Sequence, residues 1–306
     1  MNIVRAEDYH VPVMLQECLE GMQLRPEGCY VDVTFGGGGH SRAILKELQG
    51  AGMLYSFDQD PDAAARAPQQ PCFTFIASNF RHLARFMDYY DRLGQVDAIL
   101  ADLGVSSHHF DAMERGFSFR DETPLLDMRM NNRAGLSARD ILNSYEEEQL
   151  ADVLYRYGEL KQSRSLAKLI IKARAVAPLQ TVGDLIAALR PALRPDQEKK
   201  LLACIFQALR IEVNGELKAL EELLEASLRV LRPGGRLVVM TYHSLEDRIV
   251  KNFLKGTDDS AEAQIYGTAR SAWRLITRKP LVASAEELER NPRSRSAKLR
   301  IAERIR

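Results

Sequence analysis

Residues 30–41 read YVDVTFGGGGHS, and this stretch decides the fold of the chain. An apolar strand pattern runs into four consecutive glycines, and helix-forming residues follow at 42–48. Strand, glycines and helix in this order are typical of a cofactor-binding loop, because backbone without side chains lets a ligand approach the helix N-terminus closely. The stretch therefore predicts the first βα unit of an α/β sheet, with a nucleotide-type cofactor at its loop.

Short apolar segments alternate with helical segments from residue 29 to residue 105. Four of them are predicted strands, at 29–35, 52–57, 72–77 and 96–103. This alternation indicates a parallel sheet of the α/β class. The carboxyl ends of parallel strands line the ligand crevice of such a sheet, so we expect the functional residues directly after each strand.

The alternation stops at 137–213, where the sequence indicates helices only. The predicted helices start at a capping box formed by Ser144 and Glu147, at 165, at a cap formed by Thr181 and Asp184, and at 196. We interpret residues 113–213 as an all-helical domain inserted into a sheet domain made of 1–112 and 214–306. The insertion is expected to recognise the substrate.

The α/β pattern resumes after the insertion. The sequence predicts a helix at 216–231, a turn at 233–235, a strand at 236–242, a helix at 245–255 and strands at 272–277 and 297–302. Ser244 with Asp247 is interpreted as a cap of the helix at 245–255, rather than as part of a hydrolase site with His243.

Charge balance and composition exclude several classes of protein. The 306 residues hold 42 Lys and Arg against 42 Asp and Glu, which excludes a uniformly basic nucleic-acid coat. The longest apolar run, 201–206, is far too short to span a bilayer, and the first ten residues read as no secretory signal. Four scattered cysteines show no zinc-ligand spacing, so we expect a cytoplasmic protein with free, buried thiols and no metal.

Two acids and the lack of a lysine in the loop narrow the choice of cofactor. Asp58 follows the second predicted strand, where a carboxylate can accept hydrogen bonds from the ribose hydroxyls of an adenosine. Without a lysine the loop is no Walker loop for ATP. An acid-x-Gly-x-Gly-x-Gly pattern, associated with S-adenosylmethionine enzymes, starts at Asp32 with Thr34 in place of its first glycine. Asp32 suits a cationic ligand and would repel a pyrophosphate, so S-adenosylmethionine is preferred. His40 either touches the ligand or caps the helix.

The segment DLGVSS, residues 102–107, follows the fourth predicted strand. A methyl acceptor would lie here, and a carboxylate that accepts an amine N–H would make that nitrogen a better nucleophile. Asp102 is the candidate for this catalytic role. Contact with the cofactor is the preferred interpretation of Asp102, and a buried loop cap is the third. His108 and His109 are interpreted as polar loop contacts rather than metal ligands.

Longer motifs along residues 10–303 carry a resemblance. They are VDVTFGGGGHS at 31–41, DQDP at 58–61, DLGVSS at 102–107, RGFSFR at 115–120, FQALRIEVNGEL at 206–217, LRPGGRLVVMTYHSLEDRIVKNF at 231–253 and NPRSRSAKLRIAE at 291–303. Together they resemble the bacterial small-subunit ribosomal RNA cytosine-N4 methyltransferases, the methyltransferase H family.

This resemblance implies a class I, Rossmann-like sheet of an S-adenosylmethionine-dependent methyltransferase, interrupted by a helical domain. It implies methyl transfer to the exocyclic N4 of a cytidine in the decoding centre, at the P site, of 16S rRNA in the small ribosomal subunit. The cofactor contacts that it implies fall at Gly38, Gly39, His40, Asp58, Phe80, Asp102 and His109. His109 departs from the Gln common in the family, which leaves that hydrogen bond open, and Phe80 either borders an adenine or packs in the core.

Two other functions stay open from the residues alone. The generic glycine loop and the ribose acid also fit a nicotinamide-dependent (NAD-type) oxidoreductase. A catalytically silent RNA-binding assembly factor could keep the same fold. Monomer and homodimer are both left open.

The last part of the chain is basic although the whole is neutral. Residues 270–306 hold 11 Lys and Arg against 4 acids and include Trp273. In a chain that resembles an RNA-modifying family, we expect this segment to be part of the surface that contacts phosphates.

Overall fold

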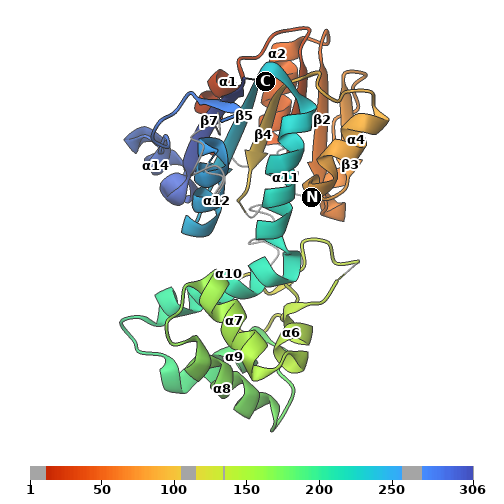
Figure 1. Cartoon of the computed structure of the whole chain (residues 1–306). Coiled ribbons are helices and arrows are strands. Elements are labelled where there is room, and N and C mark those ends of the chain that lie inside the picture. Colours follow the sequence, from red (N-terminus) through yellow and green to blue (C-terminus); the bar gives the residue numbers. More distant parts are fainter. Residues whose placement is uncertain (1–11, 105–114, 134, 257–270, 306) are drawn as a thin grey trace, which may run out of the picture. The chain divides into compact units, whose positions relative to one another are not determined.

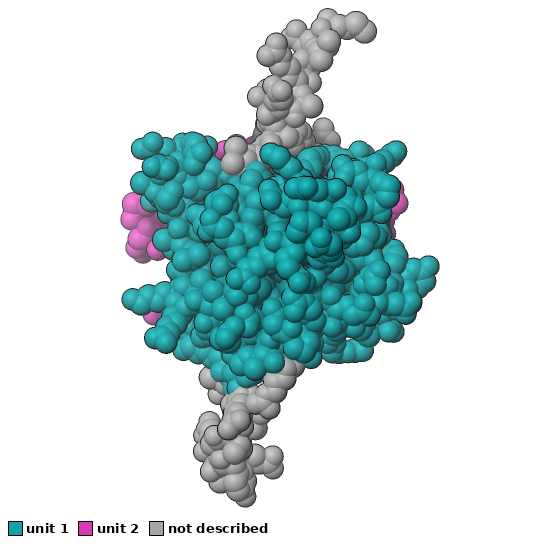
Figure 2. Space-filling view, turned by 90° about the horizontal axis from the view of Figure 1, so that it is seen from above, with its two compact units in different colours: residues 1–104, 217–306 teal, residues 105–216 magenta. Residues whose placement is uncertain are grey.

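The computed structural model describes residues 12–104, 115–133, 135–256 and 271–305 (Figure 1). The chain divides into two compact units, which Figure 2 shows in teal and magenta. The α/β unit consists of residues 1–104 and 217–306, and the helical unit of residues 105–216. Each unit has its own core and is described by itself.

The described strands of the α/β unit form one sheet of seven, in the order β3-β2-β1-β4-β5-β7-β6. Their bounds are β1 Cys29–Asp32, β2 Met53–Asp58, β3 Phe73–Ala77, β4 Val96–Asp102, β5 Leu231–Thr241, β6 Trp273–Leu275 and β7 Lys298–Arg304. Strands β1 to β5 run parallel, whereas β7 lies antiparallel between β5 and β6. The predicted α/β class is confirmed. The strand order reverses between β1 and β4, where an open sheet leaves a ligand crevice.

Helices cover both faces of this sheet, because successive strand residues point to opposite sides. Tyr30 and Leu54 pack on one face, and their neighbours Val31 and Tyr55 on the other. The helices of the first face are α1 Leu15–Met22 and α2 Gly39–Leu48, and those of the second are α4 Leu83–Tyr89, α11 Glu216–Val230 and α12 Ser244–Lys255 (Figure 1). Shorter elements are α3 Pro61–Ala64, η1 Phe80–His82, α14 Ala285–Arg290 and η4 Pro292–Ser296.

The described part of the helical unit consists mainly of helices around one apolar core. The helices are α6 Ala138–Ser144, α7 Glu147–Gly158, α8 Ser163–Arg174, α9 Val182–Leu189, η3 Arg190–Ala192 and α10 Glu198–Asn214. Thr181 and Asp184 form the predicted cap of α9, which ends before Pro191 as expected. The predicted insertion, 113–213, falls within this unit, and its role in substrate recognition stays a prediction.

The predicted capping box of Ser144 and Glu147 is wrong. Two helices occupy this stretch, because Tyr145 between them has an extended backbone. Ser144 is the last residue of α6, and its hydroxyl donates to the main-chain oxygen of Asp140 at 2.7 Å. The capping box of α7 lies two residues further on, between Glu146 and Gln149. The three-residue spacing of a capping box occurs at both positions, so it does not show where the helix begins.

The predicted turn at 233–235 is wrong, because these residues lie inside β5. The pairing of β5 with β4 shifts its register between Val96 and Ala98, and this irregularity accommodates Pro233 and the two glycines. A side chain at Gly235 would begin 3.0 Å from the main-chain oxygen of Val96 in β4. Glycine is therefore needed for close strand approach.

No helix in the described segments combines the length and the apolar character needed to cross a membrane. All four cysteines lie in described segments and are free, as expected. Cys18 and Cys72 are buried, but Cys29 and Cys204 are partly exposed, so the expectation of burial is wrong for these two.

Asp97 joins three segments near the amino end of β4. Its carboxylate accepts hydrogen bonds from the main-chain N–H of Cys29 at 2.8 Å, from Nε of Arg232 at 2.6 Å and from the guanidinium of Arg25. Burial alone would raise the pKa of Asp97, but these donors outweigh burial and hold the pKa below its usual value. The charged form of Asp97 therefore stabilises the fold.

Asp97→Asn should lower the free energy of unfolding by about 1–3 kcal/mol near neutral pH, because the guanidinium groups lose their charged acceptor. Since the native pKa is depressed, this difference from wild type is present above the usual Asp pKa of about 3.9 and disappears as the pH falls through the native pKa. Urea denaturation across this range measures it, with the exposed Asp91→Asn as control. An equal difference at low pH would contradict the assignment.

Candidate functional site

The predicted site residues gather at the carboxyl edge of the sheet. Gly38 lies in the turn from β1 into α2, and Gly39 and His40 are the first residues of α2. Asp58 is the last residue of β2, Phe80 follows β3, and Asp102 is the last residue of β4. Strands β1 and β4 are neighbours at the point where the strand order reverses. His108 and His109 lie outside the described residues. The described candidates therefore surround the crevice that the topology predicts.

The glycine loop has a backbone that side chains would strain. Gly36 and Gly38 have φ values of 52° and 77°, in the left-handed region. The N–H of Gly38 donates to the main-chain oxygen of Phe35 at 2.7 Å, which closes a tight turn before α2 begins at Gly39. A side chain at Gly38 would begin 2.7 Å from the Phe35 ring. The loop thus brings bare backbone to the N-terminus of a ten-residue helix.

Asp58 is tied to this loop. Its Oδ2 accepts the N–H of Gly36 at 2.7 Å and its Oδ1 accepts the N–H of Asp60 at 2.8 Å. These two hydrogen bonds hold the carboxylate in place. Asp58 is partly exposed, so its carboxylate lies at the edge of the crevice. The side-chain amide of Asn79 donates to Oε1 of Gln59 at 2.8 Å, which joins the ends of β2 and β3 beside Phe80.

Phe80 is partly buried. It starts the turn η1 and packs against the core on the α4 and α11 face. The neighbouring Arg81 lies 3.1 Å, Nε to Oε2, from Glu222 of α11. This position agrees with the core-packing interpretation of Phe80, and its contact with an adenine stays a prediction.

Asp32 has no exposed oxygen to offer a ligand. The residue is 1% exposed, Oδ1 accepts the N–H of Thr34 at 3.0 Å, and Oδ2 accepts the hydroxyl of Ser41 at 2.6 Å. The Ser41 hydroxyl in turn lies 2.8 Å from that of Ser56 in β2. The carboxylate therefore orders the loop and α2, and it acts on a ligand only through its charge.

Thr34 connects β1 with β4. Its Oγ1 accepts the main-chain N–H of Asp102 at 2.7 Å and lies 3.4 Å from Oδ1 of Asp32. The hydroxyl thus holds the ends of both strands that border the crevice. The sequence carries a signal for this role, because Thr34 stands where the glycine pattern expects its first glycine. A glycine there would leave the N–H of Asp102 without this acceptor.

Asp102 is held between a tyrosine and a histidine. Its Oδ1 accepts the hydroxyl of Tyr242 at 2.8 Å, and its Oδ2 lies 3.8 Å from Nδ1 of His40. Burial raises the pKa of Asp102, and His40 and Tyr242 oppose that rise without cancelling it. Its side chain keeps 22% exposure. A more basic carboxylate that still meets solvent is placed to accept a hydrogen bond or a proton.

His40 does not cap α2. The N-cap is Gly38, and Nε2 of His40 lies 3.1 Å from the main-chain oxygen of Val13, just before α1. The residue is 6% exposed. Nε2 donates to this carbonyl, which can only accept, and Nδ1 faces Asp102. The capping interpretation is therefore wrong, and contact of His40 with a cofactor stays a prediction.

Tyr242 is a site residue that the sequence did not reveal. It follows β5, and its ring lies so close to Gly104 that a side chain there would begin 2.6 Å from it. Burial and the neighbouring Asp102 raise the pKa of Tyr242 well above its usual value, so the phenol keeps its proton and donates. Its N–H donates to Glu246 at 2.9 Å. The signal in the sequence is the place of Tyr242 as the first residue after β5.

The predicted cap of Ser244 with Asp247 is wrong. His243 is the N-cap of α12 and forms a capping box with Glu246. The carboxylate of Asp247 instead accepts a hydrogen bond from Nε of Arg300 at 2.7 Å and lies 3.6 Å from Nζ of Lys298. Asp247 therefore pairs with Arg300 and Lys298 of β7 and does not cap the helix.

The basic segment 270–306 is less available to phosphate than its composition predicts. Glu303 pairs with Arg236 and Arg274, as Asp247 does with Arg300 and Lys298. Trp273 is 5% exposed and packs against Phe253, with ring centroids 5.9 Å apart. Trp273 therefore belongs to the core, and phosphate contact by the basic segment stays a prediction.

Comparison with known proteins gives a full-length match. The model of the MraW methylase family matches residues 7–305. A protein of Porphyromonas gingivalis named ribosomal RNA small subunit methyltransferase H is 64% identical, over 97% of both chains. Proteins of the same name from Parabacteroides distasonis and Bacteroides fragilis are 61% and 56% identical, over 97% of this chain and 98% and 97% of theirs.

Thr34→Val should lower the free energy of unfolding by about 1–3 kcal/mol, because the N–H of Asp102 loses its acceptor while the side-chain volume is kept. Thr34→Ser retains the hydroxyl and should cost less. Urea denaturation measures the free energy of unfolding of both variants. Amide hydrogen exchange measures how well the N–H of Asp102 is protected in each of them. Unchanged exchange of this amide in Thr34→Val would show that the hydroxyl does not hold β4.

Proposed function

The chain belongs to the MraW methylase family, and we propose that it transfers a methyl group from S-adenosylmethionine to N4 of a cytidine in the decoding centre of 16S rRNA. The names of relatives at 56–64% identity along the whole chain support ribosomal RNA of the small subunit as the substrate. The observation that carries the chemistry is Asp102, a carboxylate of raised pKa beside the crevice. Family membership gives no support to a nicotinamide oxidoreductase.

The residues at the sheet edge fit S-adenosylmethionine. The left-handed turn at Gly38 leaves bare backbone at the N-terminus of α2, and Asp58 holds a carboxylate at the end of β2. We assign the cofactor to Gly38, Gly39, His40, Asp58, Phe80 and Asp102, with His109 as a further candidate. When bound, the cofactor supplies an electrophilic methyl group on a positively charged sulfur. The buried charge of Asp32 favours such a cation.

Asp102 has the properties needed to activate an exocyclic amine. The lone pair of this nitrogen is delocalised into the cytosine ring, and a carboxylate that accepts its N–H makes it more nucleophilic. When the nitrogen gains a methyl group it must lose a proton. Tyr242 donates to Oδ1 of Asp102, so Oδ2, which lies 3.8 Å from Nδ1 of His40, is assigned to this proton. The target base must leave its stack to reach this site.

The proposal is tested by incubating the chain with labelled methyl donor and small ribosomal subunits that lack the modification. We expect label on one cytidine, located by mass-spectrometric mapping of 16S rRNA. Asp102→Asn should lower the rate at least about 100-fold, with Asp91→Asn as matched control. Intact RNA binding without any label would favour the silent assembly factor, and label on another atom would replace the proposed target.

Tyr242→Phe tests the role of Asp102 through pH. Methyl transfer needs the charged carboxylate, so the rate should rise as the pH rises through the pKa of Asp102. The Tyr242 hydroxyl lowers this pKa, and its loss should move the acidic limb of kcat/KM to higher pH. Tyr89→Phe, at a residue that is 78% exposed, is the control. An acidic limb at the same pH in Tyr242→Phe would contradict Asp102 as the titrating group.

A further inference from the structure

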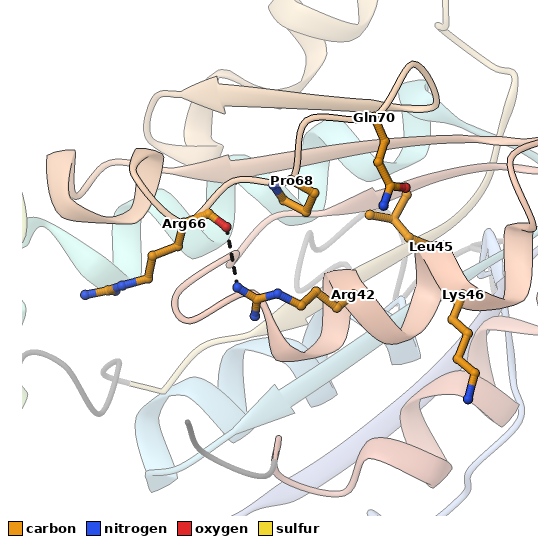
Figure 3. Close-up of a pocket in the computed structure, with 6 residues that line it drawn as sticks. All are labelled: Arg42, Leu45, Lys46, Arg66, Pro68 and Gln70. Carbon is orange, nitrogen blue, oxygen red and sulfur yellow. Dashed lines mark hydrogen bonds between the residues drawn. The ribbon is translucent and has the colours of Figure 1, made fainter. Parts of the chain in front are cut away.

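A pocket of about 380 Å³ lies beside α2 in the α/β unit (Figure 3). Its lining residues come from α2 and from the segment between α3 and β3, and they are Arg42, Leu45, Lys46, Arg66, Pro68 and Gln70. Three of these described residues are cations and none is an acid. The pocket is separate from the crevice residues assigned above.

The three cations form a row across the pocket. Arg42 and Lys46 are four residues apart on α2, so they share one helix face. Figure 3 shows Arg42 in the middle, with the side chains of Arg66 and Lys46 extending to its two sides. Arg42 and Lys46 are exposed, and Arg66 is partly exposed. Leu45, which is 6% exposed, and Pro68 are the apolar residues that line the pocket.

Arg42 links this row to the glycine loop. Its Nη1 donates to the main-chain oxygen of Gly37 at 2.7 Å, and its Nη2 donates to the main-chain oxygen of Arg66 at 3.4 Å. Arg42 follows the N-cap Gly38 by four residues, about one helical turn. Arg42 therefore lies about one turn from the loop assigned to the methyl donor, and Lys46 about two turns from it.

We propose that the row of Arg42, Lys46 and Arg66 binds the sugar–phosphate backbone of the RNA substrate next to the methylated nucleotide. A row of cations matches a run of phosphates, and guanidinium groups bind phosphate oxygens in pairs. The choice of RNA as the polyanion rests on the proposed function.

The test measures binding rather than turnover, so it stays distinct from the test of methyl transfer. Small ribosomal subunits lacking the modification are titrated against wild type and against the double variant Lys46→Gln, Arg66→Gln at several salt concentrations. We expect affinity to fall about tenfold and the slope of log affinity against log salt to shrink by about 1 to 2. Calorimetry should show unchanged binding of S-adenosylmethionine. Arg42 is left intact because it contacts the loop.

Two controls locate the effect. Lys255→Gln removes an exposed lysine on α12, and Arg278→Gln with Lys279→Gln removes exposed cations of the C-terminal segment. Unchanged affinity and salt slope in the pocket variant, or a loss only in the variant at 278 and 279, would overturn the proposal. The proposal would also be overturned if inorganic phosphate stabilised wild type against thermal unfolding but not the double variant, while both bound small subunits equally well. That result would show a site for free phosphate.

Discussion

The hydroxyl of Thr34 holds together the two strand ends on which the site depends. It accepts the N–H of Asp102 from β4 and lies within hydrogen-bonding distance of the buried Asp32 of β1. Asp32 also binds Ser41 of α2, so the glycine loop, its helix and the catalytic candidate share one polar network. Because Asp32 and Ser41 are buried, a partner lost at either of them leaves a polar atom without compensation. The crevice is therefore ordered before any ligand enters it.

The sequence predicted the parts of this structure that local patterns encode. Apolar runs ending in polar residues located β1 to β4, and the glycines located the start of α2. Tyr242 escaped prediction because it meets Asp102 across 140 residues of sequence, through the pairing of β5 with β4. The caps of α7 and α12 were misplaced because several neighbouring residues can cap a helix, and only tertiary packing selects among them.

The number of cations in a segment does not tell how many of them can bind a ligand, because neighbouring acids pair with some of them. The segment 270–306 has 11 cations against 4 acids, yet acids on β7 and α12 pair with several of these cations. The row at Arg42, Lys46 and Arg66 contributes little to the composition but faces no acid among the described residues that line its pocket. A polyanion responds to such local imbalance, since neighbouring opposite charges cancel beyond short distances.

The position of β7 has a consequence for how the chain is made. Strand β5 needs β7 as its antiparallel neighbour, although Thr241 and Lys298 are 57 residues apart, and the helical unit is already complete in sequence at residue 216. During synthesis the helical unit can fold as a continuous segment before β5, β6 and β7 are made, and β5 is then made well before its neighbour β7. The exposed edge of β5 is then a place where a chaperone or a premature partner strand competes with correct folding.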